Sequence, residues 1–139
     1  MITAEIFVED GTADPEYVEA SEGAVLVREH GIDRIRVTAS AEDVVARTVE
    51  VVWGSGARVL RVSPWVVSVP ELAALTGKDR DEVRKWTRRK GFPAVFANLR
   101  SHKMWLLEEL VDWFADEGIP LKVTPPTAEM RRELEKELG

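Results

Sequence analysis

The sequence predicts an α+β protein built from two unlike domains and a C-terminal helix. Strand-like and helix-like segments follow one another in the order β-α-β-β-α-β over the first 63 residues. Two short helical segments come next, each with its own capping motif, and a glycine separates them. The charge of these two parts of the chain also differs. Residues 1–67 contain six Lys/Arg against twelve Asp/Glu, whereas residues 68–115 contain nine Lys/Arg against seven Asp/Glu. These observations predict domains at 1–63 and 64–118, followed by a linker and helix at 119–139.

The chain is expected to begin with a strand and a short helix. Residues 2–9 alternate between apolar and other side chains, which is the period of a half-buried strand. The apolar positions that share one face are Ile2, Ala4, Ile6 and Val8. Asp14 then precedes Pro15, and this pair is typical of a helix start because proline needs no amide partner in the first turn.

A β-hairpin is expected over residues 23–40, with a short turn that contains His30 and Gly31. The rival interpretation is one helix over 14–29, which would leave only three strands. We prefer the hairpin because Gly23 would cost a helix interior about 1 kcal/mol. Val25 and Val27 are also better strand residues than helix residues.

The domain is expected to end with a second helix and a fourth strand. Residues 41–56 place apolar side chains at helical spacing until Gly54 and Gly56 stop the helix. Residues 57–63 then form the last strand. The whole order is that of the ferredoxin-like arrangement, in which two helices cover a four-stranded sheet. Trp53 and Trp65 lie near the junction, where we expect them to pack the two domains together.

Two capped helices begin the second domain. Ser68 and Glu71 form one capping box, and Asp79 and Glu82 form another. Gly77 ends the first helix, so the two helices and the tight turn make a helix-turn-helix pattern. The second helix is expected over 79–90, because Gly91 and Pro93 stop it. Residues 94–105 fit a small hairpin, or wing, and a third helix is expected from Glu108.

The final helix is expected to begin after Thr127, which can cap it. Its apolar seam is narrow and contains Met130, Leu134 and Leu138. An isolated helix of this length is marginal in water, so it must dock on another surface.

The second helix carries an unusual concentration of positive charge. Val83 and Trp86 are expected to face inward, together with the aliphatic stem of Lys90. The outward positions then form a basic stripe, with Arg80, Arg84 and Arg88 at spacing four and Lys85 and Arg89 beside them. Like charges at this spacing are unfavourable unless a partner neutralises them. Phosphate is such a partner, and arginine also pairs with guanine in the major groove. The alternative is that the stripe is simply a solvated face.

Residues 68–114 resemble the winged helix-turn-helix of excisionase and MerR-like DNA-binding proteins. The matching residues are Leu72, Ala73, Gly77, the VRKW of 83–86, the GFP of 91–93, Trp105 and Trp113. The acidic region in front is similar to that of some small actinobacterial helix-turn-helix proteins. The resemblance implies sequence-specific binding of duplex DNA, with the second helix in the major groove and the wing on the backbone or minor groove. The expected DNA contacts are Arg80, Arg84, Lys85, Arg88 and Arg89 on the helix, and Arg100, His102 and Lys103 in the wing.

The wing departs from the family pattern at three places. Val95 stands where a proline is expected, and Leu106 and Leu107 stand where polar or basic residues are usual. The third helix also has no Ser, Thr or Asp cap before Glu108. The two leucines are therefore expected to contact the first domain or a second subunit as an alternative to DNA.

Composition excludes several other classes of function. The chain has no cysteine, so disulfides and thiolate metal sites are ruled out, and we expect a cytoplasmic protein without a membrane segment. His30 and His102 have no second ligand at metal spacing, and no nucleophile motif or phosphate-binding loop is present. We therefore expect no catalytic centre, metal or cofactor. Trp86, Trp105 and Trp113 are expected to form a core rather than a platform for stacked bases.

Two functions remain at this point. The first is a sequence-specific DNA-binding protein, either a transcriptional regulator or an excisionase-like accessory factor. It would act as a homodimer, because one module of this size makes few contacts, and the uncovered sheet face and the C-terminal seam are candidate dimer surfaces. The alternative is a protein-interaction or ligand-sensing module that keeps the fold without binding DNA. In either case a protein partner or small ligand could bind the acidic N-terminal domain.

Overall fold

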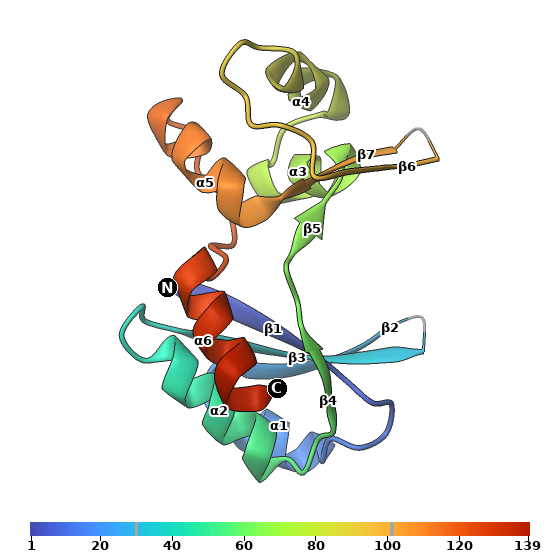
Figure 1. Cartoon of the computed structure of the whole chain (residues 1–139), viewed down its shortest axis with the longest axis vertical. Coiled ribbons are helices and arrows are strands. Elements are labelled where there is room, and N and C mark those ends of the chain that lie inside the picture. The colour runs from blue at the N-terminus through green and yellow to red at the C-terminus, as the bar shows by residue number, and fades with distance from the viewer. Residues whose placement is uncertain (30, 101) are drawn as a thin grey trace. The chain divides into compact units, whose positions relative to one another are not determined.

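The computed structural model describes residues 1–29, 31–100 and 102–139, and in this part the chain is α+β, with six helices and antiparallel sheets (Figure 1). The predicted α+β class is confirmed. The chain divides into two compact units, a first unit of Met1–Ser63 with Pro125–Gly139 and a second unit of Pro64–Thr124. The segment 119–139, expected as a separate linker and helix, is therefore shared between the two units. His30, expected in a surface turn, lies outside the described residues.

The first unit contains one sheet with antiparallel neighbours in the order β2-β3-β1-β4. Its elements are β1 (Ile2–Val8), α1 (Pro15–Ala20), β2 (Ala24–Glu29), β3 (Ile32–Ala39), α2 (Val44–Gly54), β4 (Val59–Val62) and, at the end of the chain, α6 (Ala128–Leu138). The first six follow one another in the order that the alternating sequence pattern predicts.

The structure contains the predicted hairpin of β2 and β3 and not the alternative helix over 14–29. Helix α1 begins after Asp14, whose carboxylate accepts a hydrogen bond from the Glu16 amide at 3.1 Å, and it ends at Ala20. Gly23 has a φ of +76°, and a Cβ there would collide with the backbone oxygen of Thr38. The carbonyl of Gly23 instead accepts from the Thr38 amide at 2.8 Å, which begins the pairing of the two strands.

The core of the first unit lies on one face of the sheet, where Ala4, Ile6 and Val8 are fully buried. Helix α6 packs against α2 and β4, and its Leu134 is fully buried in the same core. Thr127 caps this helix by accepting from the Met130 amide at 3.2 Å. The expected docking of the C-terminal helix therefore takes place within the unit, and Leu134 at the centre of its apolar seam is not free for a second copy.

The opposite face of this sheet mixes charged and apolar side chains, and Val25 of β2 is 56% exposed there. Glu5 is only 5% exposed and accepts a hydrogen bond from Arg36 Nε at 2.6 Å. The Arg61 guanidinium lies 4.7 Å from the centroid of the Phe7 ring. Charged groups are thus interspersed with apolar side chains over this face.

The two tryptophans near the junction differ in exposure. Trp53 lies at the end of α2 and is 63% exposed. Trp65 is half-buried and packs on the core of the second unit. None of the helices in the described part of the chain is long and apolar enough to cross a membrane.

The second unit combines three helices with a three-stranded sheet in the order β5-β7-β6. Its elements are β5 (Val66–Val67), α3 (Val69–Thr76), α4 (Arg80–Thr87), β6 (Ala97–Leu99), β7 (His102–Leu106) and α5 (Leu107–Asp116). The expected hairpin is confirmed as β6 and β7. Strand β5 is an addition that the sequence did not suggest, and it pairs with β7 through Val66 and Val67.

An aromatic cluster holds the second unit together. Trp86 and Trp105 are each 2% exposed, and Phe114 is 1% exposed. Phe92 lies edge-on to Trp113, with the ring centroids 4.8 Å apart. The prediction of a core is confirmed for Trp86 and Trp105, whose buried rings cannot stack on nucleic-acid bases, and half-buried Trp113 packs against the same core.

Helix α5 begins at Leu107 rather than Glu108. Leu107 is fully buried in the core of its own unit, and its amide donates to the carbonyl of Trp65 at 3.0 Å. The backbone of Trp65 thus provides the partner that a side-chain cap would otherwise supply. The expectation that this leucine contacts the first domain or a second subunit is therefore wrong.

Candidate nucleic-acid interface

Capping interactions define the start of α3, the turn between α3 and α4, and the start of α4. The Glu71 carboxylate accepts from the amide and the hydroxyl of Ser68 at 3.3 and 2.8 Å. Gly77 ends α3 with a φ of +73°, a left-handed conformation that glycine adopts without strain. The Asp79 carboxylate then accepts from the Glu82 amide at 2.8 Å and begins α4. Both predicted capping sites are confirmed, and only three residues separate the helices.

Two buried side chains determine which face of α4 is exposed. Val83 is fully buried and Trp86 is 2% exposed, as predicted from their positions. Arg80, Arg84 and Lys85 are exposed on the same helix. Because the inward side chains prevent rotation of α4 about its axis, these three cations are held toward solvent.

Helix α4 ends at Thr87, three residues before the predicted end at Lys90. The amides of Arg88 and Arg89 donate to Lys85 and Trp86, three residues back, so the last turn tightens. The chain leaves the helical path because Phe92 must enter the aromatic cluster, where its ring lies 5.7 Å from that of Trp105. Arg88, Arg89 and Lys90 are all exposed. Arg88 is the C-terminal cap of α4 and keeps helical dihedral angles, whereas Arg89 and Lys90 lie in the turn that follows.

Two of the cations already have carboxylate neighbours. Arg84 Nη1 lies 2.9 Å from Asp81 Oδ1, and Arg89 Nη1 lies 3.5 Å from Glu117 Oε2. The two arginine side chains are 49% and 52% exposed, and exposed pairs of this kind contribute only about 0–1 kcal/mol each. A phosphate group could therefore replace either carboxylate at little cost.

Three acidic side chains at the start of α4 lie near Lys85 and Arg89. Lys85 and Arg89 line a shallow hollow together with Trp86 and three acidic side chains, which are Asp79, Asp81 and Glu82. Over 79–90 the sequence contains six Lys/Arg and three Asp/Glu, so the segment stays positive. The acidic side chains limit where a phosphate can approach, because they would repel it along the N-terminal turn.

The other expected contacts lie on the β6–β7 hairpin. Arg100 occupies the turn with a φ of +47°, which is uncommon for a residue other than glycine. His102 and Lys103 are exposed on β7, opposite Leu99 and Asn98 respectively. The eight expected residues therefore form two groups, one on α4 and the turn that follows it and one on the hairpin. Figure 1 shows the hairpin as a separate projection of the second unit.

The segment between α4 and the hairpin contributes an apolar surface that sequence reasoning missed. Phe96 is 54% exposed and Val95 is 41% exposed. The Phe96 amide donates to the Met104 carbonyl at 2.8 Å, which holds this residue beside the hairpin. The sequence shows two phenylalanines around Pro93, but it does not distinguish them. In the folded unit Phe92 packs against the aromatic cluster, whereas Phe96 stays exposed.

Groups of three or more His, Asp or Glu side chains that could hold a metal ion are absent from the described residues. Comparison of the chain with protein-family models, with curated proteins and with solved structures gives no match.

Proposed function

We propose that the chain is a sequence-specific double-stranded DNA-binding protein that reads the major groove with α4. The observation that carries this proposal is the arrangement of α4 itself. Its start is capped by Asp79, its inward face is fixed by Val83 and Trp86, and Arg84 and Lys85 remain exposed. A rigid helix that presents long cations to solvent has the geometry needed to reach base edges.

The second unit acts in this proposal as a winged helix-turn-helix. Helices α3 and α4 form the two-helix motif, and the β6–β7 hairpin is the wing that carries Arg100, His102 and Lys103. The hairpin contacts the phosphate backbone, and exposed Phe96 adds an apolar contact beside it. Phosphate contacts set the position of the module, whereas Arg84 and Arg88 discriminate between base pairs.

The first unit is a ferredoxin-like domain in this proposal, and the whole protein is a transcriptional regulator or an excisionase-like accessory factor. A homodimer would place two modules on half-sites about 34 Å apart. The dimer contact does not involve the buried seam of α6, since Leu134 is already in the core.

The proposal is tested by selecting fragments from genomic DNA, followed by titration of the selected site by fluorescence anisotropy. Substitution of a base-reading arginine is expected to cost about 1–3 kcal/mol of specific binding and to relax the site. The test variant is Arg84→Ala with Arg88→Ala. The control, Arg58→Ala with Arg132→Ala, removes the same charge from exposed positions of the first unit. Equal affinity of the parent and the test variant would overturn the assignment.

A second candidate is a protein-interaction module that keeps the fold without binding DNA. It is favoured by the pairing of Arg84 with Asp81 and of Arg89 with Glu117, and by the net charge of −6 for the whole chain. Fragment selection that enriches no sequence, together with no mobility shift at low salt, would favour this candidate.

A further inference from the structure

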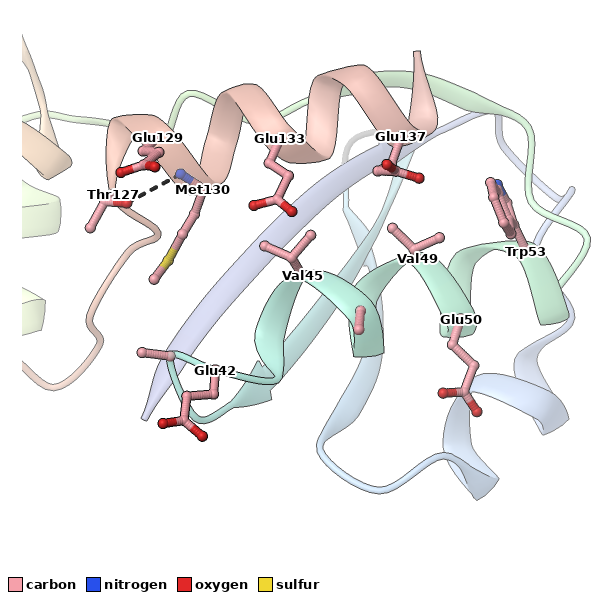
Figure 2. Close-up of a pocket in the computed structure, with 12 residues that line it drawn as sticks. Glu42, Val45, Val49, Glu50, Trp53, Thr127, Glu129, Met130, Glu133 and Glu137 are labelled. Atoms are coloured by element: carbon pink, nitrogen blue, oxygen red, sulfur yellow. Dashed lines mark hydrogen bonds between the residues drawn. The ribbon is translucent and has the colours of Figure 1, made fainter.

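A groove of about 760 Å³ lies between α2 and α6 of the first unit (Figure 2). Val45, Val49 and Trp53 form one ridge along α2 at spacing four, and Met130 faces them from α6. Figure 2 shows the side chains of Val45, Val49 and Met130 directed into the space between the helices. Because these residues belong to one compact unit, the groove depends on that unit alone.

The floor of the groove is apolar and incompletely covered. Val45, Val49 and Met130 are half-buried, and they pack against the core with their inner sides. Trp53 is 63% exposed at one end of the groove. An open apolar strip beside a well-packed core commonly marks a surface that binds a partner.

The rim of the groove is strongly acidic. Five exposed glutamates line it, and neither lysine nor arginine does: Glu42, Glu50, Glu129, Glu133 and Glu137. None of the five makes an ion pair with any residue in 1–29, 31–100 or 102–139. Other carboxylates on the same helix do find partners, since Glu135 lies 3.0 Å from Arg131. The groove therefore concentrates negative charge that the described chain leaves uncompensated.

We propose that this groove binds a basic amphipathic helix of a partner protein. Both α2 and α6 have 11 residues, so each presents about 16 Å of surface, or three helical turns. A third helix can lie along the ridges of two such helices and place its apolar side chains on Val49 and Trp53. Lysines and arginines at the edges of that helix would then meet the free glutamates.

Other classes of occupant fit the groove less well. The carboxylates would repel the phosphates of nucleic acids and of anionic lipid headgroups. Helix α4 of a second copy has the required charge, but its apolar side chains Val83 and Trp86 are buried in its own unit. The inference concerns the first unit and is independent of DNA binding by the second.

The experiment titrates the full chain against a labelled model peptide of about 14 residues, with leucines along one helical face and lysines elsewhere. Two control peptides replace the lysines by glutamate or the leucines by serine. The groove variant is Glu133→Lys with Glu137→Lys, and its control is Asp10→Lys with Glu19→Lys, which makes the same charge change at exposed positions outside the groove. A second pair compares Trp53→Ser with Leu60→Ser, where Leu60 is a 59% exposed residue on β4.

The proposal predicts that the lysine–leucine peptide binds and that both control peptides do not. At about 0.15 M salt, the groove charge variant should bind at least tenfold more weakly, whereas its control should change by less than about twofold. Trp53→Ser should weaken binding several-fold and Leu60→Ser should not. Equal losses in the groove and control variants would mean that charge alone attracts the peptide, and would overturn the proposal. Absence of peptide binding, or self-association of the chain that Trp53→Ser abolishes, would overturn it as well.

Discussion

Helices α4 and α6 have similar construction and opposite charge. Each is short, and each begins at a side-chain cap, Asp79 in one case and Thr127 in the other. Each is anchored by few buried residues, which are Val83 and Trp86 in α4 and Leu134 in α6. Most of the remaining positions are charged, with three Lys/Arg against two Asp/Glu in α4 and three against four in α6.

This comparison shows how little apolar surface is needed to position a helix once its ends and its neighbours are fixed. The tertiary contact supplies most of the stability, so the outward residues of a short helix are free to serve another purpose. We propose that the sign of the outward charge then selects the class of partner. Phosphate suits α4, whereas a cationic segment suits the groove beside α6.

The largest expected effect on stability comes from removing the buried side chain that anchors α4. Trp86→Ala should destabilise the second unit by about 3–5 kcal/mol, because a buried aromatic side chain leaves a large cavity. Trp53→Ala is the matched control and should change stability by less than about 1 kcal/mol, since Trp53 is 63% exposed. Urea unfolding followed by circular dichroism measures both, and an unchanged transition for Trp86→Ala would contradict its place in the core.

The anchor of α6 should have the next largest effect. Leu134→Ala should destabilise the first unit by about 2–4 kcal/mol, because this side chain is fully buried beside the sheet. Leu60→Ala should cost no more than about 0.5 kcal/mol at its exposed position on β4. If Leu134→Ala leaves the unfolding transition unchanged, α6 is not part of the core of the first unit.

The caps should have the smallest effect on stability, and a similar one in both helices. Asp79→Ala and Thr127→Ala should each cost about 1 kcal/mol, because each leaves an amide of the first turn without its partner. Asp43→Ala is the control, since Asp43 precedes α2 without making a side-chain cap hydrogen bond. Thermal unfolding of the three variants should therefore place Asp43→Ala closest to the parent.

Local signals in the sequence predicted most of the secondary structure. Asp14, Asp79 and Thr127 marked helix starts that the structure bears out, because a cap depends on residues two or three positions away. The β2–β3 hairpin followed from Gly23, whose conformation excludes a side chain. These features are determined by neighbours along the chain, so no knowledge of the fold was required.

Features that depend on distant residues could not be predicted in this way. Helix α4 ends early because Phe92 packs on Trp105 and Trp113, which lie on β7 and α5. Strand β5 has only two residues, and its partner β7 lies far along the chain. The sequence identified the basic residues of the candidate interface, but the pairing of Arg89 with Glu117 and the exposure of Phe96 appear only in the folded unit.

We propose that the second unit attracts DNA and that the first unit repels it. Comparing the DNA affinity of the second unit with that of the whole chain tests this proposal. The first unit has nine Lys/Arg against sixteen Asp/Glu, and the second unit has ten against nine. The first unit should therefore repel phosphate over a distance that salt shortens. Residues 64–124 should consequently bind random duplex DNA more tightly than the full chain at low salt.

The most direct measurement of this claim is the affinity of both proteins for random duplex DNA across a salt series. If about four or five phosphates are neutralised by each second unit, the logarithm of affinity should fall with the logarithm of salt concentration at a slope near −4 per subunit. The advantage of residues 64–124 should shrink as salt increases, because the repulsion from the first unit is screened. Equal affinities of the two proteins would contradict the repulsion of DNA by the first unit, and a flat salt dependence for both would contradict DNA binding by the cations of the second unit.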